Sequence, residues 1–217
     1  RAHCDRLGAV LIFDEVKTGC RLATGGVQAT AHAAGVLPDV ATFGKALANG
    51  YPLAAVVGRA DVMDAARRAW VSSTLAGEST ALAAAHAVLD RHEREDVCAA
   101  LHATGDALRS AVAHARDGSG VADVALLGLA PMWFLRFGGA DPAAAARRET
   151  TFLAAARAAG VLFKRGAYDY AMLAHDAAAV AAVGEAAAAG FAAVAALDAN
   201  PRRPERREGA RLPADGT

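Results

Sequence analysis

Residues 8–59 read GAVLIFDEVKTGCRLATGGVQATAHAAGVLPDVATFGKALANGYPLAAVVGR, and two short apolar runs in this stretch decide the fold. The first run, residues 9–13, is too short for a free-standing helix and is typical of a strand buried on both faces. It ends at Asp14. The second run leads to Gly44 and Lys45, just before a strong turn signal at residues 49–52. Because ligands in open α/β sheets collect beyond the carboxyl ends of the strands, we expect Asp14 and Lys45 to face one crevice.

Several motifs follow one another in this stretch: Phe13-Asp14-Glu15-Val16, Lys17-Thr18-Gly19, Gly25-Gly26, Pro38-Asp39, Thr42-Phe43-Gly44-Lys45 and Asn49-Gly50-Tyr51-Pro52. In this order they resemble the core of the class III (ω-type) aminotransferases, a fold-type I family that depends on pyridoxal 5'-phosphate (PLP). Within that family the sequence looks most like glutamate-1-semialdehyde aminomutase. The similarity is contiguous from about Leu11 to Ala85 and looser to about Leu197.

The resemblance assigns roles to four residues. Lys45 would form the Schiff base with PLP, and Asp14 would pair with the pyridinium nitrogen. Val16 would pack against a face of the PLP ring. Thr74 would bond the PLP phosphate of the neighbouring subunit, which implies a homodimer with shared active sites.

The residue types suit this chemistry. PLP acts as an electron sink, and it does so well only when its ring nitrogen is protonated, a state that an adjacent carboxylate such as Asp14 enforces. Lys45 must lose its proton to condense with an aldehyde, and burial near other cations favours that loss. Once substrate displaces it, the freed amine can move a proton between the substrate and the cofactor.

The resemblance therefore predicts an enzyme that transfers an amino group between a primary amine or amino acid and a carbonyl compound. One alternative is the intramolecular amino exchange of glutamate-1-semialdehyde 2,1-aminomutase, which would use the same residues without a separate amino donor. A second alternative is a truncated or split fragment without activity of its own. Complete enzymes of the family are longer, and their N-terminal half holds the phosphate-binding loop and the residue that stacks on PLP.

The predicted fold class is α/β, with part of the large-domain sheet of a PLP-dependent fold-type I transferase followed by a small C-terminal α/β domain. We expect the large-domain part at residues 1–117, the small domain at 118–198 and a disordered tail at 199–217, because the tail has too few large apolar residues to offset its chain entropy. The sequence predicts helices at 28–34, at 61–68 with Asp61 as N-cap, at 79–115 with a break near 91–96, at 142–159 and at 177–197. It predicts strands at 53–57, 132–137 and 161–163.

The composition and charge of the chain argue against several classes of function. The chain has 217 residues, 54% of them hydrophobic, and a formal net charge of zero, so we expect no nucleic-acid partner. We find no uninterrupted apolar run typical of a membrane span and no signal peptide at residue 1, so the cytoplasm is the expected compartment. The three cysteines are widely spaced and the histidines are scattered, which predicts no metal site. Arg21 fits a solvated loop residue better than a contact with substrate or partner.

Overall fold

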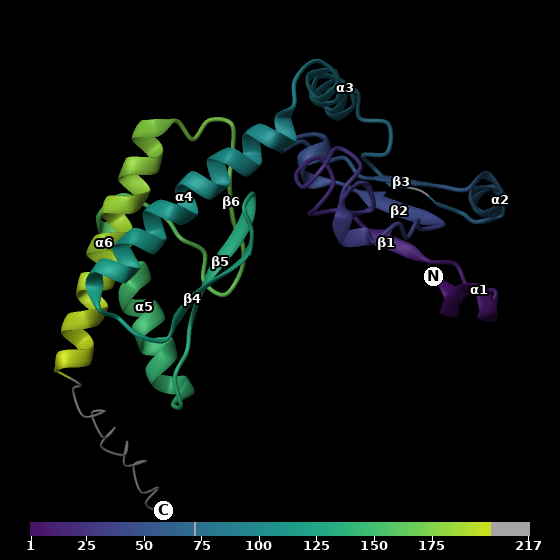
Figure 1. Cartoon of the computed structure of the whole chain (residues 1–217). Helices are drawn as coiled ribbons and strands as arrows, with labels where there is room; N and C mark the ends of the chain where they lie inside the picture. The colour runs from purple at the N-terminus through teal and green to yellow at the C-terminus, as the bar shows by residue number, and fades with distance from the viewer. Residues whose placement is uncertain (72, 201–217) are drawn as a thin grey trace, which may run out of the picture. The chain divides into compact units, whose positions relative to one another are not determined.

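The computed structural model describes residues 1–71 and 73–200, so most of the predicted tail at 199–217 lies outside the described residues. The chain forms two compact units. The first unit contains Arg1–Ala107, Leu129–Met132 and Tyr170–Asp176, and the second contains Leu108–Gly128, Trp133–Asp169 and the chain from Ala177. The units part inside helix α4 (Val97–Ser119), which Figure 1 draws in teal. The domain boundary predicted at residues 117 and 118 falls at the end of this helix and stays a prediction.

A three-stranded sheet lies at the centre of the first unit. Its order is β1-β2-β3, with β1 at Ile12–Asp14, β2 at Val40–Phe43 and β3 at Ala55–Gly58. Strands β1 and β2 are parallel, with Asp14 opposite Thr42, whereas β3 runs antiparallel to β2. The parallel pairing brings the carboxyl ends of β1 and β2 to one edge, as the sequence predicts.

The burial on both faces that is predicted for residues 9–13 is wrong for β1, and β3 is also largely exposed. Ile12 is 58% exposed and Val56 is 56% exposed, whereas Val40 and Ala41 of the central strand are buried. An apolar run shows that a side chain favours burial, but burial also requires an element that covers it. Within the described residues, no element covers these side chains of the two edge strands.

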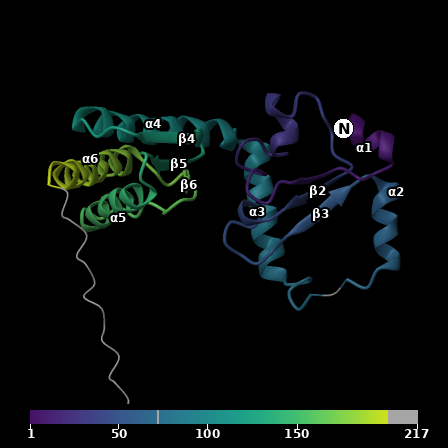
Figure 2. The same ribbon diagram turned by 90° about the horizontal axis from the view of Figure 1, so that it is seen from below.

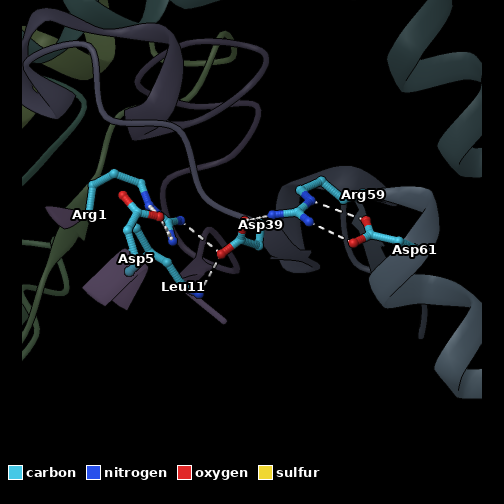
Figure 3. A network of polar contacts seen from close by, with 6 residues as sticks. All are labelled: Arg1, Asp5, Leu11, Asp39, Arg59 and Asp61. Carbon is cyan, nitrogen blue, oxygen red and sulfur yellow. Dashed lines mark hydrogen bonds and ion pairs between the residues drawn. The ribbon is translucent and has the colours of Figure 1, made fainter. Parts of the chain in front are cut away.

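Asp39 fixes the start of β2, and Figure 3 shows the polar contacts around it. Its buried carboxylate accepts hydrogen bonds from Leu11 N at 2.8 Å, Arg1 Nη1 at 2.8 Å and Arg59 Nη1 at 2.7 Å. The Leu11 N–H and the two guanidinium groups hold the pKa of this carboxyl far below its usual value. Arg59 also binds Asp61, with Nη2 2.6 Å from Oδ2. Asp39 thus joins the beginnings of β1 and β2 to the end of β3.

The short connecting helices differ in detail from the sequence expectation. The predicted helix at 28–34 is two 3₁₀ turns, η1 (Val27–Ala29) and η2 (Ala31–Ala33). The helix predicted at 61–68 is an α-helical turn, α2 (Ala60–Met63), followed by the 3₁₀ turn η4 (Asp64–Arg68). Asp61 is not its N-cap, because its carboxylate is engaged by the Arg59 guanidinium instead.

The long helical stretch that follows is broken where the charged residues predict a break. Helix α3 spans Ser79–Arg94 and α4 begins at Val97. The N-cap of α3 is Glu78, whose carboxylate accepts hydrogen bonds from Thr80 N at 2.9 Å and Ala81 N at 2.6 Å. Helix α3 contacts the turn η3 (Lys45–Leu47), which follows β2. The helix therefore supports the segment that carries Lys45.

The second unit packs helices against one side of a sheet, as Figures 1 and 2 both show. Its sheet has the order β4-β5-β6, and the predicted strand at 132–137 and helices at 142–159 and 177–197 are confirmed. The strand predicted at 161–163 is wrong: these residues form no strand, and Leu162 is 79% exposed. The elements of this part of the chain are β4 (Val124–Leu129), β5 (Met132–Phe137), α5 (Pro142–Ala158), β6 (Asp169–Tyr170) and α6 (Ala177–Ala199).

Helix α6 has 23 residues and contains a window of 18 residues with a mean hydropathy of 1.8, so by length and composition it could span a membrane. Much of this hydropathy comes from alanine, and the buried residues Gly190, Phe191 and Val194 lie on the side that packs with α5. A core helix of this kind passes the same test of length and composition.

Candidate active site

Asp14 ends β1 with its carboxylate exposed at the edge of the sheet. One oxygen, Oδ1, accepts hydrogen bonds from Val16 N at 3.0 Å and from Thr42 Oγ1 at 3.3 Å. Within the described part of the chain, Oδ2 accepts no hydrogen bond. The carboxylate is therefore fixed by one oxygen and can bind a cationic or N–H group with the other.

The next residue, Glu15, is a carboxylate that sequence reasoning missed as a separate feature. It is only 2% exposed and accepts hydrogen bonds from Val27 N at 2.8 Å, Gln28 N at 3.2 Å and the Thr18 hydroxyl. A Cβ at Gly26 would overlap this carboxylate, which explains the glycine there. The signal in the sequence was a second carboxylate directly after Asp14, followed by a glycine-rich loop whose N–H groups need hydrogen-bond acceptors. Glu15 thus shapes the loop after Asp14.

Lys45 begins the turn η3, directly after Gly44. Its φ of 48° is in the left-handed region, which costs a residue with a side chain about 1–2 kcal/mol. Its side chain is exposed, and its ammonium group makes no hydrogen bond or ion pair with any described residue. An unusual backbone conformation that presents an unpaired amine is the kind of local strain found at functional sites.

The structure brings Val16 to the same edge. A Cβ built on Gly44 would lie 3.5 Å from Cγ1 of Val16, so this side chain lies beside the residue that precedes Lys45. Asp14 thus contacts Thr42 of the neighbouring strand. Val16 lies beside Gly44, the residue that precedes Lys45. Thr74 is exposed in a turn before α3, and its hydroxyl makes no hydrogen bond with the described residues. Of the four predicted site residues, only Lys45 lines the cavity described next; Asp14, Val16 and Thr74 do not.

A cavity of about 510 Å³ lies beside Lys45, in the size range of small-molecule sites. Its charged lining residues are Lys17, Arg21 and Lys45, and its other walls include Asn49 and Tyr51 of the turn after η3. A smaller cavity of about 360 Å³ shares Arg21 and Asn49 with it and is otherwise mostly apolar. A primary amine at the edge of a cavity can condense with a carbonyl group of a ligand bound there.

Arg21 is not the solvated loop residue that the sequence predicts. It is half-buried, its Nη1 donates to Ala171 O at 2.8 Å and to Pro131 O at 3.3 Å, and its guanidinium carbon lies 4.7 Å from the centre of the Tyr170 ring. Sequence reasoning missed it because all three partners lie more than a hundred positions away in the chain. Burial lowers the pKa of the guanidinium.

The three cysteines are free thiols, with Cys20 and Cys98 buried and Cys4 partly exposed. Burial raises the pKa of both buried thiols. Among residues 1–71 and 73–200, no group of three or more His, Cys, Asp or Glu side chains could hold a metal ion.

Comparisons with known proteins agree on one family. The sequence model of the family "Aminotransferase class-III" matches residues 1–174, which is most of the chain. The chain is 40% identical over 146 residues to 2'-deamino-2'-hydroxyneamine transaminase of Streptomyces kanamyceticus, a match that covers 67% of this chain and 36% of the relative. It is 39% identical over 136 residues to glutamate-1-semialdehyde 2,1-aminomutase of Methanosarcina acetivorans, covering 61% of this chain and 31% of the relative.

The fold is also similar to that of a solved structure. The FumI protein of a Sphingopyxis species, in its PLP internal aldimine form, superimposes with a TM-score of 0.83 at 30% sequence identity. The match covers 92% of this chain and 47% of that protein. The chain thus spans less than half the length of the proteins it matches here.

Proposed function

This chain belongs to the class-III aminotransferase family, and we propose from that premise that it carries the lysine and carboxylate which hold PLP in an enzyme of amino-group transfer. One observation carries the proposal: the unpaired Lys45 amine lies beside a cavity, two residues after β2, and Asp14 ends the neighbouring parallel strand with one oxygen free. The match to a PLP-bound relative over nearly the whole chain supports the same cofactor.

The residues present fit the cofactor. The free Oδ2 of Asp14 provides the negative charge that a protonated pyridine nitrogen needs, while Oδ1 stays fixed by Val16 N and Thr42 Oγ1. The exposed amine of Lys45 provides the covalent attachment. Val16 provides the apolar contact for the ring. When bound, PLP would supply an electron sink for the carbanion of the substrate.

In the proposed mechanism, Asp14 and Lys45 each have one role. Asp14 keeps a proton on the ring nitrogen by charge pairing. Lys45 would hold PLP through Nζ, and the same amine, once free, would move a proton from the substrate carbon that bears the amino group to the C4′ carbon of the cofactor. Both roles use groups that are already free in the described part of the chain.

The proposed reaction is amino transfer between a primary amine or amino acid and a carbonyl compound. Intramolecular exchange, as named for the Methanosarcina relative, is the second candidate, favoured by that 39% identity. An assay of the protein with PLP, amino donors and carbonyl acceptors tests the proposal. We expect amino transfer with a separate donor and none in Lys45→Ala. If product forms from an amino aldehyde without any donor, the exchange reaction is the better assignment, and if neither forms, the proposed function is wrong.

Thr74 supports a proposal about assembly. Its hydroxyl is exposed and makes no hydrogen bond with the described residues, so it is available to the PLP phosphate of a second subunit in a symmetric homodimer. Exposed apolar side chains of this unit, such as Trp70 at 95% and Val71 at 84%, supply surface that a partner could bury.

Mixing two inactive variants, Lys45→Ala and Thr74→Ala, tests this assembly. One site of each mixed dimer would combine an intact lysine with the threonine of the other subunit, so activity should return after subunit exchange. If Thr74→Ala alone impairs cofactor binding but mixing restores no activity despite exchange, Thr74 acts within its own subunit. The proposed compartment is the cytoplasm, since three free cysteines suit a reducing environment.

A further inference from the structure

The smaller of the two cavities, called here the α3–α4 cavity, is a separate space within the first unit. Its volume is about 360 Å³, and its lining comes from α3, from the start of α4, from the loop that contains Cys20 and from residues 171–174. Lys45 does not line it. Since an apolar cavity of about 150 Å³ already admits benzene, this one has room for a molecule of one or two rings.

The walls of the α3–α4 cavity are mostly apolar. The large apolar side chains that line it are Val88, Val97, Leu101, Met172 and Leu173. Val97 and Leu101 are buried, whereas Met172 is 50% exposed and Leu173 is 39% exposed. An apolar ligand in the cavity would cover part of this exposed surface, and such burial is favourable.

The charged side chains of the lining already have partners. Arg91 binds Glu95, with Nε 3.0 Å from Oε2, and Arg21 donates from Nη1 to two main-chain carbonyls. Among the described residues, no Asp or Glu lines the cavity. Burial lowers the pKa of His92, so the imidazole in the lining is neutral near neutral pH. The α3–α4 cavity therefore suits an uncharged ligand.

His92 supplies the polar group that can orient a ligand. Its Nδ1 lies 3.0 Å from Thr24 Oγ1, which fixes the ring, and its Nε2 makes no hydrogen bond with the residues that the structure describes. In a neutral imidazole one nitrogen donates and the other accepts, so Nε2 has either role, depending on the tautomer. A hydroxyl group both donates and accepts, and it therefore matches Nε2 in either tautomer.

We propose that the α3–α4 cavity is a second ligand site, which binds a small uncharged aromatic alcohol such as a phenol, with the hydroxyl group on His92 Nε2. The inference requires neither PLP nor amino transfer. The walls of this cavity include Ala46 and Asn49, which also line the Lys45 cavity. Because Ala46 belongs to the turn η3, an occupant would contact the turn that carries Lys45.

The test titrates the protein with phenol, toluene and benzoate, three probes that differ in one substituent of the ring. Ligand-observed NMR measures each affinity, without any need for turnover. We expect saturable binding of phenol and at least about tenfold weaker binding of benzoate, whose carboxylate loses its hydration in an apolar cavity. Each titration is run with and without PLP, and the affinity for phenol should be the same in both.

Two neighbouring positions of α3 locate the site. Val88→Phe places a ring in the cavity and should weaken the binding of phenol and of toluene by about tenfold or more. Leu89→Phe is the matched control, since it introduces the same ring at a position that is 41% exposed and does not line the cavity. Its affinities should equal those of the wild-type protein. Circular dichroism checks that both variants are folded.

Substitutions of His92 test the hydrogen bond. His92→Phe keeps an aromatic ring but removes the polar nitrogen, so it should weaken phenol by about twofold to tenfold and leave toluene unchanged, the range of one net hydrogen bond. His92→Gln, whose amide both donates and accepts, should retain part of the affinity for phenol. The comparison with toluene separates recognition of the hydroxyl group from the structural contact with Thr24, whose loss would weaken both probes.

Five results would overturn the inference. They are an absence of saturable phenol binding by the wild-type protein, tighter binding of benzoate than of phenol, wild-type affinity for phenol in Val88→Phe, an equal loss of phenol and toluene in His92→Phe, and displacement of phenol by PLP. The last result would place the probe in the Lys45 cavity. Failure of the proposed function is a different result, since a protein that transfers no amino group can still bind phenol in the α3–α4 cavity.

Discussion

The two units of this chain bury different kinds of side chain. In the second unit, Phe152 is fully buried and its ring centre lies 4.8 Å from that of Phe191 and 5.2 Å from that of Phe163. In the first unit, the largest fully buried side chain is the carboxylate Glu15. All of the large apolar side chains that are exposed in the described residues belong to the first unit, with the exception of Leu162.

The second unit closes an apolar core of its own, which is the usual source of stability. The first unit orders its loops with buried carboxylates, and Asp14 and Lys45 are exposed at the edge of its sheet. Mutations in the first unit should therefore change chemistry more than stability, and mutations in the second should do the reverse.

The largest expected effect is on chemistry, at Asp14. Asp14→Asn keeps the shape and the acceptor for Val16 N but removes the charge, so PLP should still bind while amino transfer falls by about two to four decades. Steady-state kinetics measure the loss, and circular dichroism should show an unchanged fold. Turnover near the wild-type rate would mean that Asp14 only caps the strand.

The matching change in the second unit is Phe152→Ala. Removing a fully buried ring that touches three other aromatic rings should lower the free energy of unfolding by about 3–5 kcal/mol. Urea denaturation measures this loss, and the rate of amino transfer by the remaining folded protein should stay within a few-fold. A large change in the rate with little change in stability would contradict the division between the units.

A smaller expected effect is a change in the free energy of unfolding with pH, caused by Asp169. Burial raises the pKa of this carboxyl from 3.8 to about 6, against the opposing effects of the Lys164 N–H group at 2.9 Å and the charge of Lys164. A raised pKa means that the folded state binds the proton more tightly, so the stabilisation is complete below pH 3.8 and is lost as the pH rises through about 6.

Since the group is partly solvated, the expected loss of unfolding free energy is about 1–2 kcal/mol. Thermal unfolding between these pH values measures it. Asp169→Asn can still accept the Lys164 N–H bond and should show a flatter pH profile. If the variant and the wild-type protein lose stability in parallel, another group is responsible.

The sequence predicted the elements better than their surroundings. Asp14 and Lys45 were found because each follows an apolar run, a local signal that parallel pairing of β1 and β2 brings to one edge. Exposure of Ile12 was not predicted, since covering layers are not encoded in a local pattern. The burial of Arg21 was missed because its carbonyl partners are remote in sequence. The strand predicted at 161–163 failed because residues 161–163 find no strand partner.

The central claim is that Lys45 is the amine that attaches PLP. Borohydride reduction of the PLP-loaded protein, followed by proteolysis and mass spectrometry, tests it most directly. The other lysines of this chain, Lys17 and Lys164, provide internal controls, and Lys17 is the sharper one because it lines the same cavity. The account predicts a phosphopyridoxyl group on the peptide that contains Lys45, and a label on Lys17 or Lys164 with Lys45 unmodified would contradict it.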